Sequence, residues 1–375
     1  MKTPLRFYRK TDEGRICPII RRHSNKSYSP HTYSSQKPQR KEPFAHAKVP
    51  VTIMTKLQPN GTLWLDTDGN PIHAHGGHML VHDGWYYWYG EDRRDDIYVS
   101  VYRSKNLVDW EFRRHVLTVD SPCEGYRVRT DLALFHEADG VKKKVNIERP
   151  KVLYNAKTKK FVMWAHYENG ENYLDARACI ATCDTPDGEF VYHGSFNPYG
   201  NMSRDCTLFV DAENDAYFVS ASRDNADLAV YRLTEDYMNV DRQVHTLFQG
   251  EFREAPALFY RRENGKYYLL SSWCTGWRPN QGTCATAHKM NGRWSLNYNI
   301  GDETTFRSQP AFVLPYEKEN GETVFLYFAD RWGGGDDELV QKYENPYFLS
   351  SYIVLPIRFD EYDRAYIKWC DACEI

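Results

Sequence analysis

The 375-residue sequence lacks a membrane-length hydrophobic run, a cysteine framework and a marked excess of charge of one sign. No stretch approaches the roughly 18 consecutive apolar residues that indicate a transmembrane helix, so no membrane partner is expected. The net charge of −3 gives no electrostatic reason to expect a nucleic-acid partner. The nine cysteines are an odd number without regular spacing, which favours free thiols over a disulfide scaffold.

The C-terminal end carries the only Cys-x-x-Cys pair of the chain, Cys370 and Cys373. Neither a second pair nor a histidine follows it, and a structural zinc ion needs four ligands. We therefore predict no metal at this pair and interpret the last residues as a loose tail.

The first 55 residues are basic and rich in Ser and Pro, with no helical or strand periodicity. Of the 48 Lys and Arg residues 12 lie in positions 1–50, against 3 of the 51 Asp and Glu residues. The longest apolar run there, at 17–20, is shorter than the roughly 7–15 residues of a signal-peptide core. The pattern predicts a disordered tail at 1–55 and one domain at 56–375. Without a visible export signal, the chain is expected in the cytoplasm unless its start is mis-assigned.

Aromatic residues make up 15% of the chain and recur in five strand-like segments of alternating apolar and polar residues. Each segment is followed by further strand-like stretches, and few segments show a helical pattern. Five units, each worth about four strands, predict an all-β chain folded as a five-bladed β-propeller. A twin β-sandwich is the alternative, which the regular repeat disfavours. The aromatic segments are 84–91, 160–166, 216–222, 265–273 and 323–332.

The first unit is longer than the others because it contains an insertion at about residues 120–145. The insertion includes a run of three lysines at 142–144. A charge run of this kind usually forms a solvated surface, so we interpret it as a solvated loop rather than as a binding patch.

A short polar cluster precedes the aromatic segment of each unit. In a propeller the innermost strands surround one central channel, so equivalent positions of five blades converge on one pocket. An ion in such a channel, near His75, is compatible with the sequence, but no cofactor is expected. The clusters are 73–78, 148–150, 203–205, 253–256 and 307–310.

The converging positions supply three carboxylates, from Glu148, Asp205 and Glu254, and the amide of Gln309. Cleavage of a glycosidic bond needs one protonated carboxyl to protonate the leaving oxygen, and an ionised partner. If Asp205 and Glu254 lie close together, the charge of one carboxylate would raise the pKa of the other and so keep that carboxyl protonated. The alternative is a set of buried arginine–carboxylate pairs that close the blade ends.

Several ordered motifs show a resemblance to glycoside hydrolase family 43, especially to its exo-β-1,3-galactanase branch, over roughly residues 60–357. The resemblance implies a five-bladed propeller that inverts the anomeric centre and releases galactose from β-1,3-linked galactan or arabinogalactan side chains. Members of the family are mostly exported, so the resemblance leaves the compartment open. The motifs lie at 73–77, 86–91, 148–155, 202–211, 253–257, 274–277, 305–309 and 355–357.

The resemblance also implies roles for individual residues. Glu254 corresponds to the general acid, Asp205 to the acid that tunes and orients it, and Glu148 to a carboxylate that grips the sugar hydroxyls. Further wall and hydroxyl contacts are implied for Glu91, Tyr173, Thr275 and Trp277.

The catalytic base is where the sequence departs from the wider family. That family has an Asp-Pro on the first inner strand, whereas this chain reads His75-Gly76-Gly77. In the galactanase branch, which shares this absence, the glutamine that matches Gln309 is implicated in holding the water. We therefore rank Gln309 as the water-positioning group first and Glu148 as the base second. His75 and Arg307 are further candidates for substrate binding. Arg307 could meet an acidic or hydroxyl-rich group, or form a salt bridge.

Two other functions stay open at this stage. The first is another activity of the same fold, such as β-galactofuranosidase or α-L-arabinofuranosidase, because few contacts decide hydroxyl stereochemistry. The second is a sugar-binding propeller that no longer catalyses, which the missing aspartate favours and the presence of Glu254 and Asp205 opposes.

Overall fold

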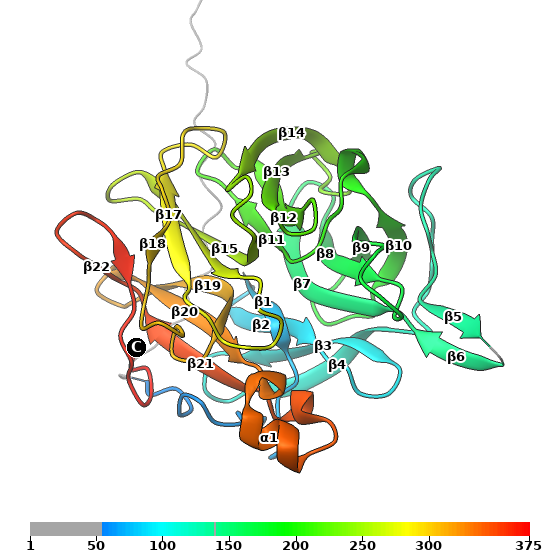
Figure 1. The fold of residues 1–375 in the computed structure, drawn as a ribbon, viewed down its shortest axis with the longest axis horizontal. Helices are drawn as coiled ribbons and strands as arrows, with labels where there is room; N and C mark the ends of the chain where they lie inside the picture. Colours follow the sequence, from blue (N-terminus) through cyan, green and yellow to red (C-terminus); the bar gives the residue numbers. More distant parts are fainter. Residues whose placement is uncertain (1–54, 139) are drawn as a thin grey trace, which may run out of the picture. The chain divides into compact units, whose positions relative to one another are not determined.

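The computed structural model describes residues 55–138 and 140–375, and these residues form an all-β chain of five sheets arranged as the blades of a propeller (Figure 1). The five-bladed fold predicted from the repeats is thus confirmed. Apart from its last residue, the predicted tail at 1–55 lies outside the described residues. None of the described helices has the length and hydrophobicity needed to cross a bilayer.

Four blades are antiparallel sheets of four strands in sequence order, and the fifth has three named strands. Blade 1 contains β1 (His75–His82), β2 (Trp85–Glu91), β3 (Ile97–Ser104) and β4 (Glu111–Thr118); blade 2 contains β7 (Asn146–Asn155), β8 (Lys160–Glu168), β9 (Arg177–Cys183) and β10 (Val191–Phe196); blade 3 contains β11 (Cys206–Val210), β12 (Ala216–Ser222), β13 (Asp227–Leu233) and β14 (Val240–Leu247); blade 4 contains β15 (Arg253–Arg261), β16 (Lys266–Trp273), β17 (Thr283–Ala287) and β18 (Tyr298–Asn299); blade 5 contains β19 (Gln309–Glu317), β20 (Thr323–Arg331) and β21 (Ser351–Pro356).

The first strand of each blade lies innermost. β1 contacts β7 and β19, β11 contacts β7 and β15, and β15 contacts β19, so the five strands form a closed ring. The five aromatic segments of the sequence become the second strands β2, β8, β12, β16 and β20, whose side chains are mostly buried between blades. Both faces of these strands are covered, which explains their density of aromatic residues.

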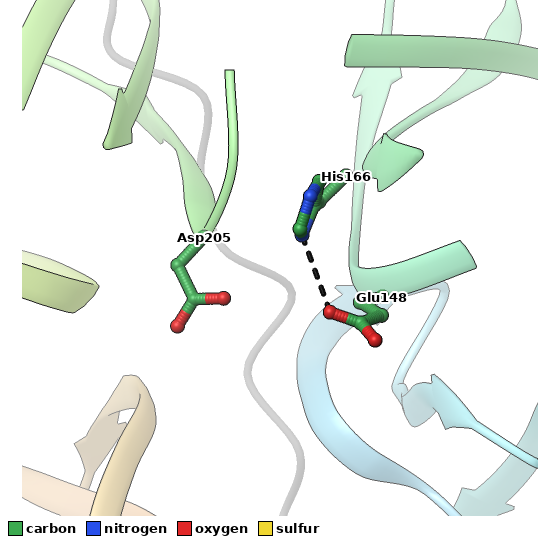
Figure 2. Close-up of side chains that lie close together, drawn as sticks. All are labelled: Glu148, His166 and Asp205. Atoms are coloured by element: carbon green, nitrogen blue, oxygen red, sulfur yellow. Dashed lines mark ion pairs between the residues drawn. The ribbon is translucent and has the colours of Figure 1, made fainter. Parts of the chain in front are cut away.

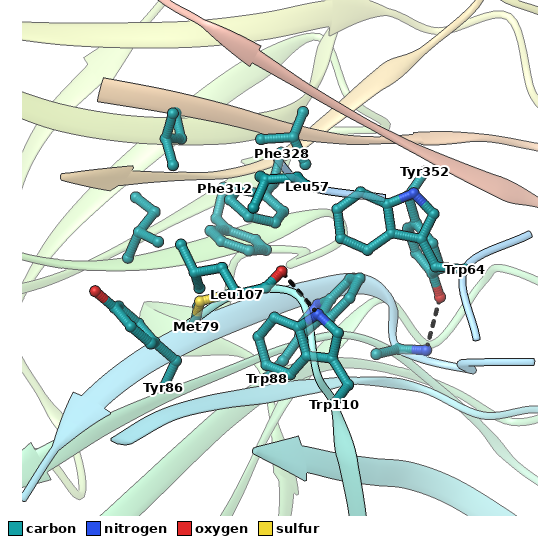
Figure 3. Packing of buried hydrophobic residues seen from close by; sticks show 14 of the residues in the cluster. Leu57, Trp64, Met79, Tyr86, Trp88, Leu107, Trp110, Phe312, Phe328 and Tyr352 are labelled. Atoms are coloured by element: carbon teal, nitrogen blue, oxygen red, sulfur yellow. Dashed lines mark hydrogen bonds between the residues drawn. The ribbon is translucent and has the colours of Figure 1, made fainter. Parts of the chain in front are cut away.

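The ring is closed by residues that precede the first blade. Thr62 pairs with Tyr352 on β21, and the side-chain amide of Asn60 exchanges hydrogen bonds with the backbone of Val354 at 2.6 and 3.0 Å. Trp64 is fully buried at the joint between blades 1 and 5, where its ring lies 5.9 Å from that of Trp88 in an edge-on arrangement (Figure 3). The first and last blades are therefore held together by a strand-like segment and a shared aromatic core.

The prediction of a loose C-terminal tail is wrong. Leu57 donates a backbone hydrogen bond to Cys373, Ile375 donates one to Thr55, and the side chain of Cys373 is buried. Backbone pairing with the start of the described chain fixes these last residues. The eight cysteines within the described part of the chain are free.

The insertion of the first unit forms a two-stranded hairpin, β5 (Phe135–Ala138) and β6 (Val141–Lys144), which leads directly into β7. Five shorter elements follow β20: η2 (Gly333–Gly335), α1 (Asp337–Lys342) and η3 (Pro346–Leu349), then β22 (Arg358–Phe359) with its partner β23 (Ala365–Tyr366) after β21. The segment from η2 to η3 carries aromatic residues to one end of the central channel.

Candidate active site

The side chains at the channel end are aimed by irregularities at the start of the inner strands. The antiparallel register shifts after His75 on β1, after Glu148 on β7 and after Glu254 on β15. The next residue is left-handed each time, with φ of 55° at Gly76, 53° at Arg149 and 53° at Ala255. Such bulges re-aim a side chain, and a left-handed non-glycine residue costs about 1–2 kcal/mol. The repeated local backbone strain therefore directs the polar side chains of these strands toward the same end of the channel.

Glu254 lies beside Asp205 at the channel. The backbone N–H of Ala255 donates to Asp205 Oδ2 at 3.0 Å, and Arg149 pairs with the same oxygen at 3.1 Å. Burial, and next the nearby charge of Asp205, raise the pKa of Glu254 to about 7. Glu254 is therefore a carboxyl that can hold a proton near neutral pH, as the sequence predicted for a general acid.

Gln309 joins this pair, and its amide is fully used. Its Nε2 donates to Glu254 Oε1 at 3.0 Å and to Ser272 Oγ at 2.9 Å, while its Oε1 accepts from Arg149 and from Trp332 Nε1. An amide has two donor hydrogens and two acceptor lone pairs, so the four contacts leave none free. Gln309 can hold a water molecule only by exchanging one of these partners.

A second group of carboxylates shares one arginine. Arg93 Nη2 donates to Glu148 Oε1 at 2.8 Å and to Glu91 Oε2 at 2.9 Å, and the hydroxyl of Tyr173 donates to Glu148 Oε1 at 2.6 Å. Burial alone would raise the pKa of Glu148, but Arg93, His166 and Tyr173 outweigh it and hold that pKa well below its usual range. Burial raises the pKa of Glu91. Glu148 is thus a carboxylate that stays ionised.

His166 lies behind Glu148. Its Nδ1 is 3.2 Å from Glu148 Oε2 (Figure 2), and its Nε2 is 2.9 Å from Glu168 Oε1. Burial opposes a charge on the ring, but the contacts with the two carboxylates raise the pKa of His166 to about 9. The ring is therefore an imidazolium that fixes Glu148 from the side opposite Arg93.

Glu148, His166 and Asp205 are also the one group in the described ranges whose ligand atoms could share a metal ion, since all lie within 4.8 Å of one another. Asp205 faces the other two across the pocket (Figure 2). However, Arg93 and Arg149 already neutralise the two carboxylates and His166 is itself charged, so the donor set does not fit a further cation.

The environment of His75 accounts for the missing aspartate. Its Nδ1 lies 3.0 Å from Asp330 Oδ1, and Asp330 Oδ2 accepts from the backbone N–H of Gly76. A Cβ on Gly76 would lie 2.6 Å from Glu91 Oε1. The space that a side chain would need on the first inner strand is therefore filled by the carboxylate of the neighbouring strand.

His75 itself is fully buried and stacks on Tyr352 at 4.9 Å. This packing makes it a support of the pocket floor rather than a sugar contact. Lys151 donates to the carbonyls of Gly76 and Gly77 at 2.5 and 2.9 Å, so an ammonium group already lies in this part of the channel. An ion near His75 stays a prediction.

Aromatic rings form one wall of the pocket. Trp277 lies edge-on to Trp332 at 5.1 Å and to Tyr347 at 5.7 Å, and the Arg93 guanidinium lies over Tyr347 at 4.8 Å. Trp277 and Tyr173 are partly exposed, at 39% and 43%. Exposed rings beside polar groups are typical of sugar sites, where the apolar face of a pyranose stacks on them.

Two predicted site residues lie at the rim. Thr275 is exposed and its hydroxyl donates to Arg278 O at 2.6 Å, while Arg307 pairs with Asp336 at 2.7 Å. For Arg307 the salt bridge, one of its two predicted interpretations, is the one found. Neither residue forms a hydrogen bond or an ion pair with Glu148, Asp205 or Glu254.

Apart from Glu91, the residues that lie opposite the predicted ones were not predicted from the sequence. In the antiparallel register His75 pairs with Glu91, Glu148 with His166, Glu254 with Ser272 and Gln309 with Asp330. Each pair places the end of a second strand next to the start of an inner strand. Counting across each hairpin would not have identified His166, Ser272 and Asp330, because each of these inner strands is bulged. From the regular pairs the count gives Tyr167, Trp273 and Arg331 instead.

Comparisons with known proteins agree with this geometry. The profile of glycosyl hydrolases family 43 matches residues 151–326. A solved exo-β-1,3-galactanase from Clostridium thermocellum is 44% identical with a TM-score of 0.74, over 85% of this chain and 66% of that chain, just under two thirds of its length. No match was found among curated protein sequences.

Two further solved structures are similar over comparable lengths. One is a family 43 β-1,3-galactosidase solved with galactodeoxynojirimycin, at 32% identity and a TM-score of 0.71, over 85% of this chain and 100% of that chain. The other is an exo-β-1,3-galactanase from Phanerochaete chrysosporium solved with β-1,3-galactotriose, at 31% identity and a TM-score of 0.71, over 86% of this chain and 68% of that chain. The chain belongs to glycosyl hydrolase family 43.

Proposed function

We propose that this protein is an exo-acting, inverting glycosidase that releases galactose from the non-reducing end of β-1,3-linked galactan or arabinogalactan side chains. The observation that carries the proposal is the Glu254 carboxyl, whose pKa is raised to about 7 beside Asp205 and Gln309 in a partly aromatic pocket. The solved relatives named above, which are described as acting on or binding β-1,3-linked galactose, support this substrate class.

In this mechanism Glu254 protonates the glycosidic oxygen as the bond breaks. Asp205 pairs with Arg149, and its charge beside Glu254 favours the protonated form of Glu254. Asn225 donates to Glu254 Oε2 at 3.2 Å and Gln309 donates to Oε1, so the carboxyl is held in one orientation. An oriented acid is what proton transfer to a poor leaving group requires.

The ionised Glu148 and the buried Glu91 would bind hydroxyl groups of the galactose ring, with Arg93 fixed between them. Gln309 also borders a cavity of about 10 Å³, which Asn280 and Trp332 line as well. A space of this size has room for about one water molecule. Gln309 as the water-positioning group and Glu148 as the alternative base therefore both stay within the proposal.

Activity is expected to fall as the pH rises through about 7, because proton donation needs the protonated form of Glu254. Below that pKa Glu254 is protonated and its titration should not change kcat/KM; above it, kcat/KM should fall about tenfold per pH unit. Asp205→Asn removes the second cause of the raised pKa, so the midpoint should move to lower pH. The profile of kcat/KM from pH 4 to 9 measures both.

Asp215→Asn, on the same blade but paired with Arg232 at 2.6 Å, is the control. An alkaline limb that Asp205→Asn leaves in place would contradict this assignment.

The function itself is tested by proton NMR of the protein with β-1,3-galactotriose, with the anomeric signals followed from the first minutes. Early α-galactose is the expected result. Early β-galactose would contradict inversion. Shifts that show binding without release of sugar would favour a non-catalytic sugar-binding propeller, and no effect at all would redirect the test to arabinofuranosides and galactofuranosides.

A further inference from the structure

The hairpin of the insertion does not stand apart from the pocket. β6 ends at Lys144, only four residues before Glu148 on β7, and Val145 between them is fully buried. Lys143 is exposed and pairs weakly with the exposed Glu171 at 3.4 Å. Lys144 is different, so the prediction that the whole run at 142–144 is a solvated loop is wrong for this residue.

The ammonium of Lys144 is held by three backbone carbonyls of the loop between β2 and β3. Its Nζ donates to Ile97 O at 2.7 Å, to Asp95 O at 2.8 Å and to Arg93 O at 3.2 Å. Three donors thus meet three acceptors, which uses every hydrogen of the ammonium group. This loop carries Arg93, the residue that bridges Glu91 and Glu148.

The main chain of Lys144 supports a second loop, between β8 and β9. A Cβ added to Gly170, whose φ is +80°, would lie 2.2 Å from Lys144 O and 3.3 Å from the Cα of Val145. Only a glycine allows so close an approach. Three residues further along, this loop presents Tyr173, whose hydroxyl donates to Glu148 Oε1.

Both loops that contact Lys144 therefore converge on the same oxygen, Glu148 Oε1, which accepts from Arg93 and from Tyr173. We propose that Lys144 is a positioning residue of the sugar pocket, which fixes the Arg93 loop and the Tyr173 loop relative to Glu148. The inference rests on the proposed galactosidase function for its substrate. It assigns to the insertion at 120–145 a part in substrate binding.

The physical reason is the geometry of the bridge. Arg93 is 27% exposed in its side chain, and a long side chain of this kind loses conformational freedom when it is held between two carboxylates. If the three carbonyls lose their donor, the Arg93 loop has fewer fixed hydrogen bonds and samples more positions. Ground-state binding of the sugar should be weakened more than the chemical step is slowed, because Glu254 and Gln309 lie on other blades.

The test compares Lys144→Met, which keeps the chain length and removes the charge, with Lys143→Met as the matched neighbour and Lys144→Arg as the conservative variant. With β-1,3-galactobiose, Lys144→Met should raise KM about tenfold and leave kcat within about threefold, as expected for lost uniform binding. Lys143→Met should leave both constants within about twofold, because exposed pairs contribute little. Lys144→Arg should recover most of the loss in KM.

A second measurement does not depend on the substrate. Amide hydrogen exchange of peptides that cover 92–98 should be faster in Lys144→Met than in the parent and unchanged in Lys143→Met. Peptides that cover 169–175 should change less, because this loop contacts the main chain of Lys144, which the substitution keeps. If the parent protein cleaves no galactobiose, the proposed function fails while the exchange result still decides whether Lys144 fixes the loops. Equal KM values for the two Met variants, or unchanged exchange in the Arg93 loop, would overturn the inference. Lys144→Gln replaces Lys144→Met if the latter does not fold.

Discussion

Glu254→Gln is expected to lower kcat for β-1,3-galactobiose by about 10²–10⁴-fold, the range that a general acid typically contributes. The amide keeps the size of the side chain and can still contact Gln309 and Asn225, but it cannot give a proton to the leaving sugar. An aryl β-galactoside with a highly acidic phenol needs no such proton. For that substrate we expect a loss of about tenfold or less.

The comparison of the two substrates separates chemistry from folding. Glu263→Gln, on the same blade and 57% exposed in its side chain, is the control and should behave as the parent on both. Equal losses on both substrates would mean that Glu254 supports the pocket without donating a proton. Full activity of Glu254→Gln on galactobiose would exclude Glu254 as the acid altogether.

Gln309→Ala is expected to have the next largest effect, a fall in kcat of about 10²-fold with KM changed much less. Four hydrogen bonds end at this amide, and they connect Glu254, Ser272, Arg149 and Trp332. Removing the amide leaves an N–H of Arg149 without its acceptor and Glu254 Oε1 without its donor. It also enlarges the cavity where a water molecule would be held. Unchanged turnover would move water activation to Glu148.

Gln309→Glu distinguishes two roles of the amide. The new carboxylate would lie next to Glu254, where Nε2 now donates at 3.0 Å. A like charge at that distance disfavours ionisation of Glu254, so the alkaline limb of the pH profile should move to higher pH. If instead the limb stays in place while kcat falls, the amide acts on the water and not on the acid. Ser272→Ala, which removes one partner of the same amide, is the control for local packing.

Much of the site could be predicted from the sequence because it depends on repetition. Glu148, Asp205, Glu254 and Gln309 occupy matching positions of successive blades, and a closed ring brings matching positions together. The structure places them in one pocket as expected. Their pKa shifts could not be predicted in the same way, because these depend on side chains that come from other segments of the chain. Arg93, for example, reaches Glu148 from a loop of a different blade.

The features that the sequence did not predict correctly also have local causes. Lys144 sits in a run of three lysines, and composition alone gives no sign that one of them faces carbonyls while its neighbour faces solvent. Cys373 was assigned to a tail because no periodic pattern surrounds it, yet backbone pairing with Leu57 needs no pattern in the side chains. Asp330 was hidden within an aromatic strand, and the bulge of β19 means that a regular count does not pair it with Gln309.

The closure between Asn60 and β21 has a consequence for the order of folding. These residues are 294 positions apart, so their contact carries a large loop-closure entropy until the blades between them have formed. Blades 1 to 4 consist of neighbouring hairpins and can form early during synthesis, whereas the segment with Asn60 and Trp64 has to wait for the last strand. We therefore expect refolding to show a slow final phase in which Trp64 becomes buried, and Asn60→Ala to accelerate unfolding far more than it slows the earlier phases.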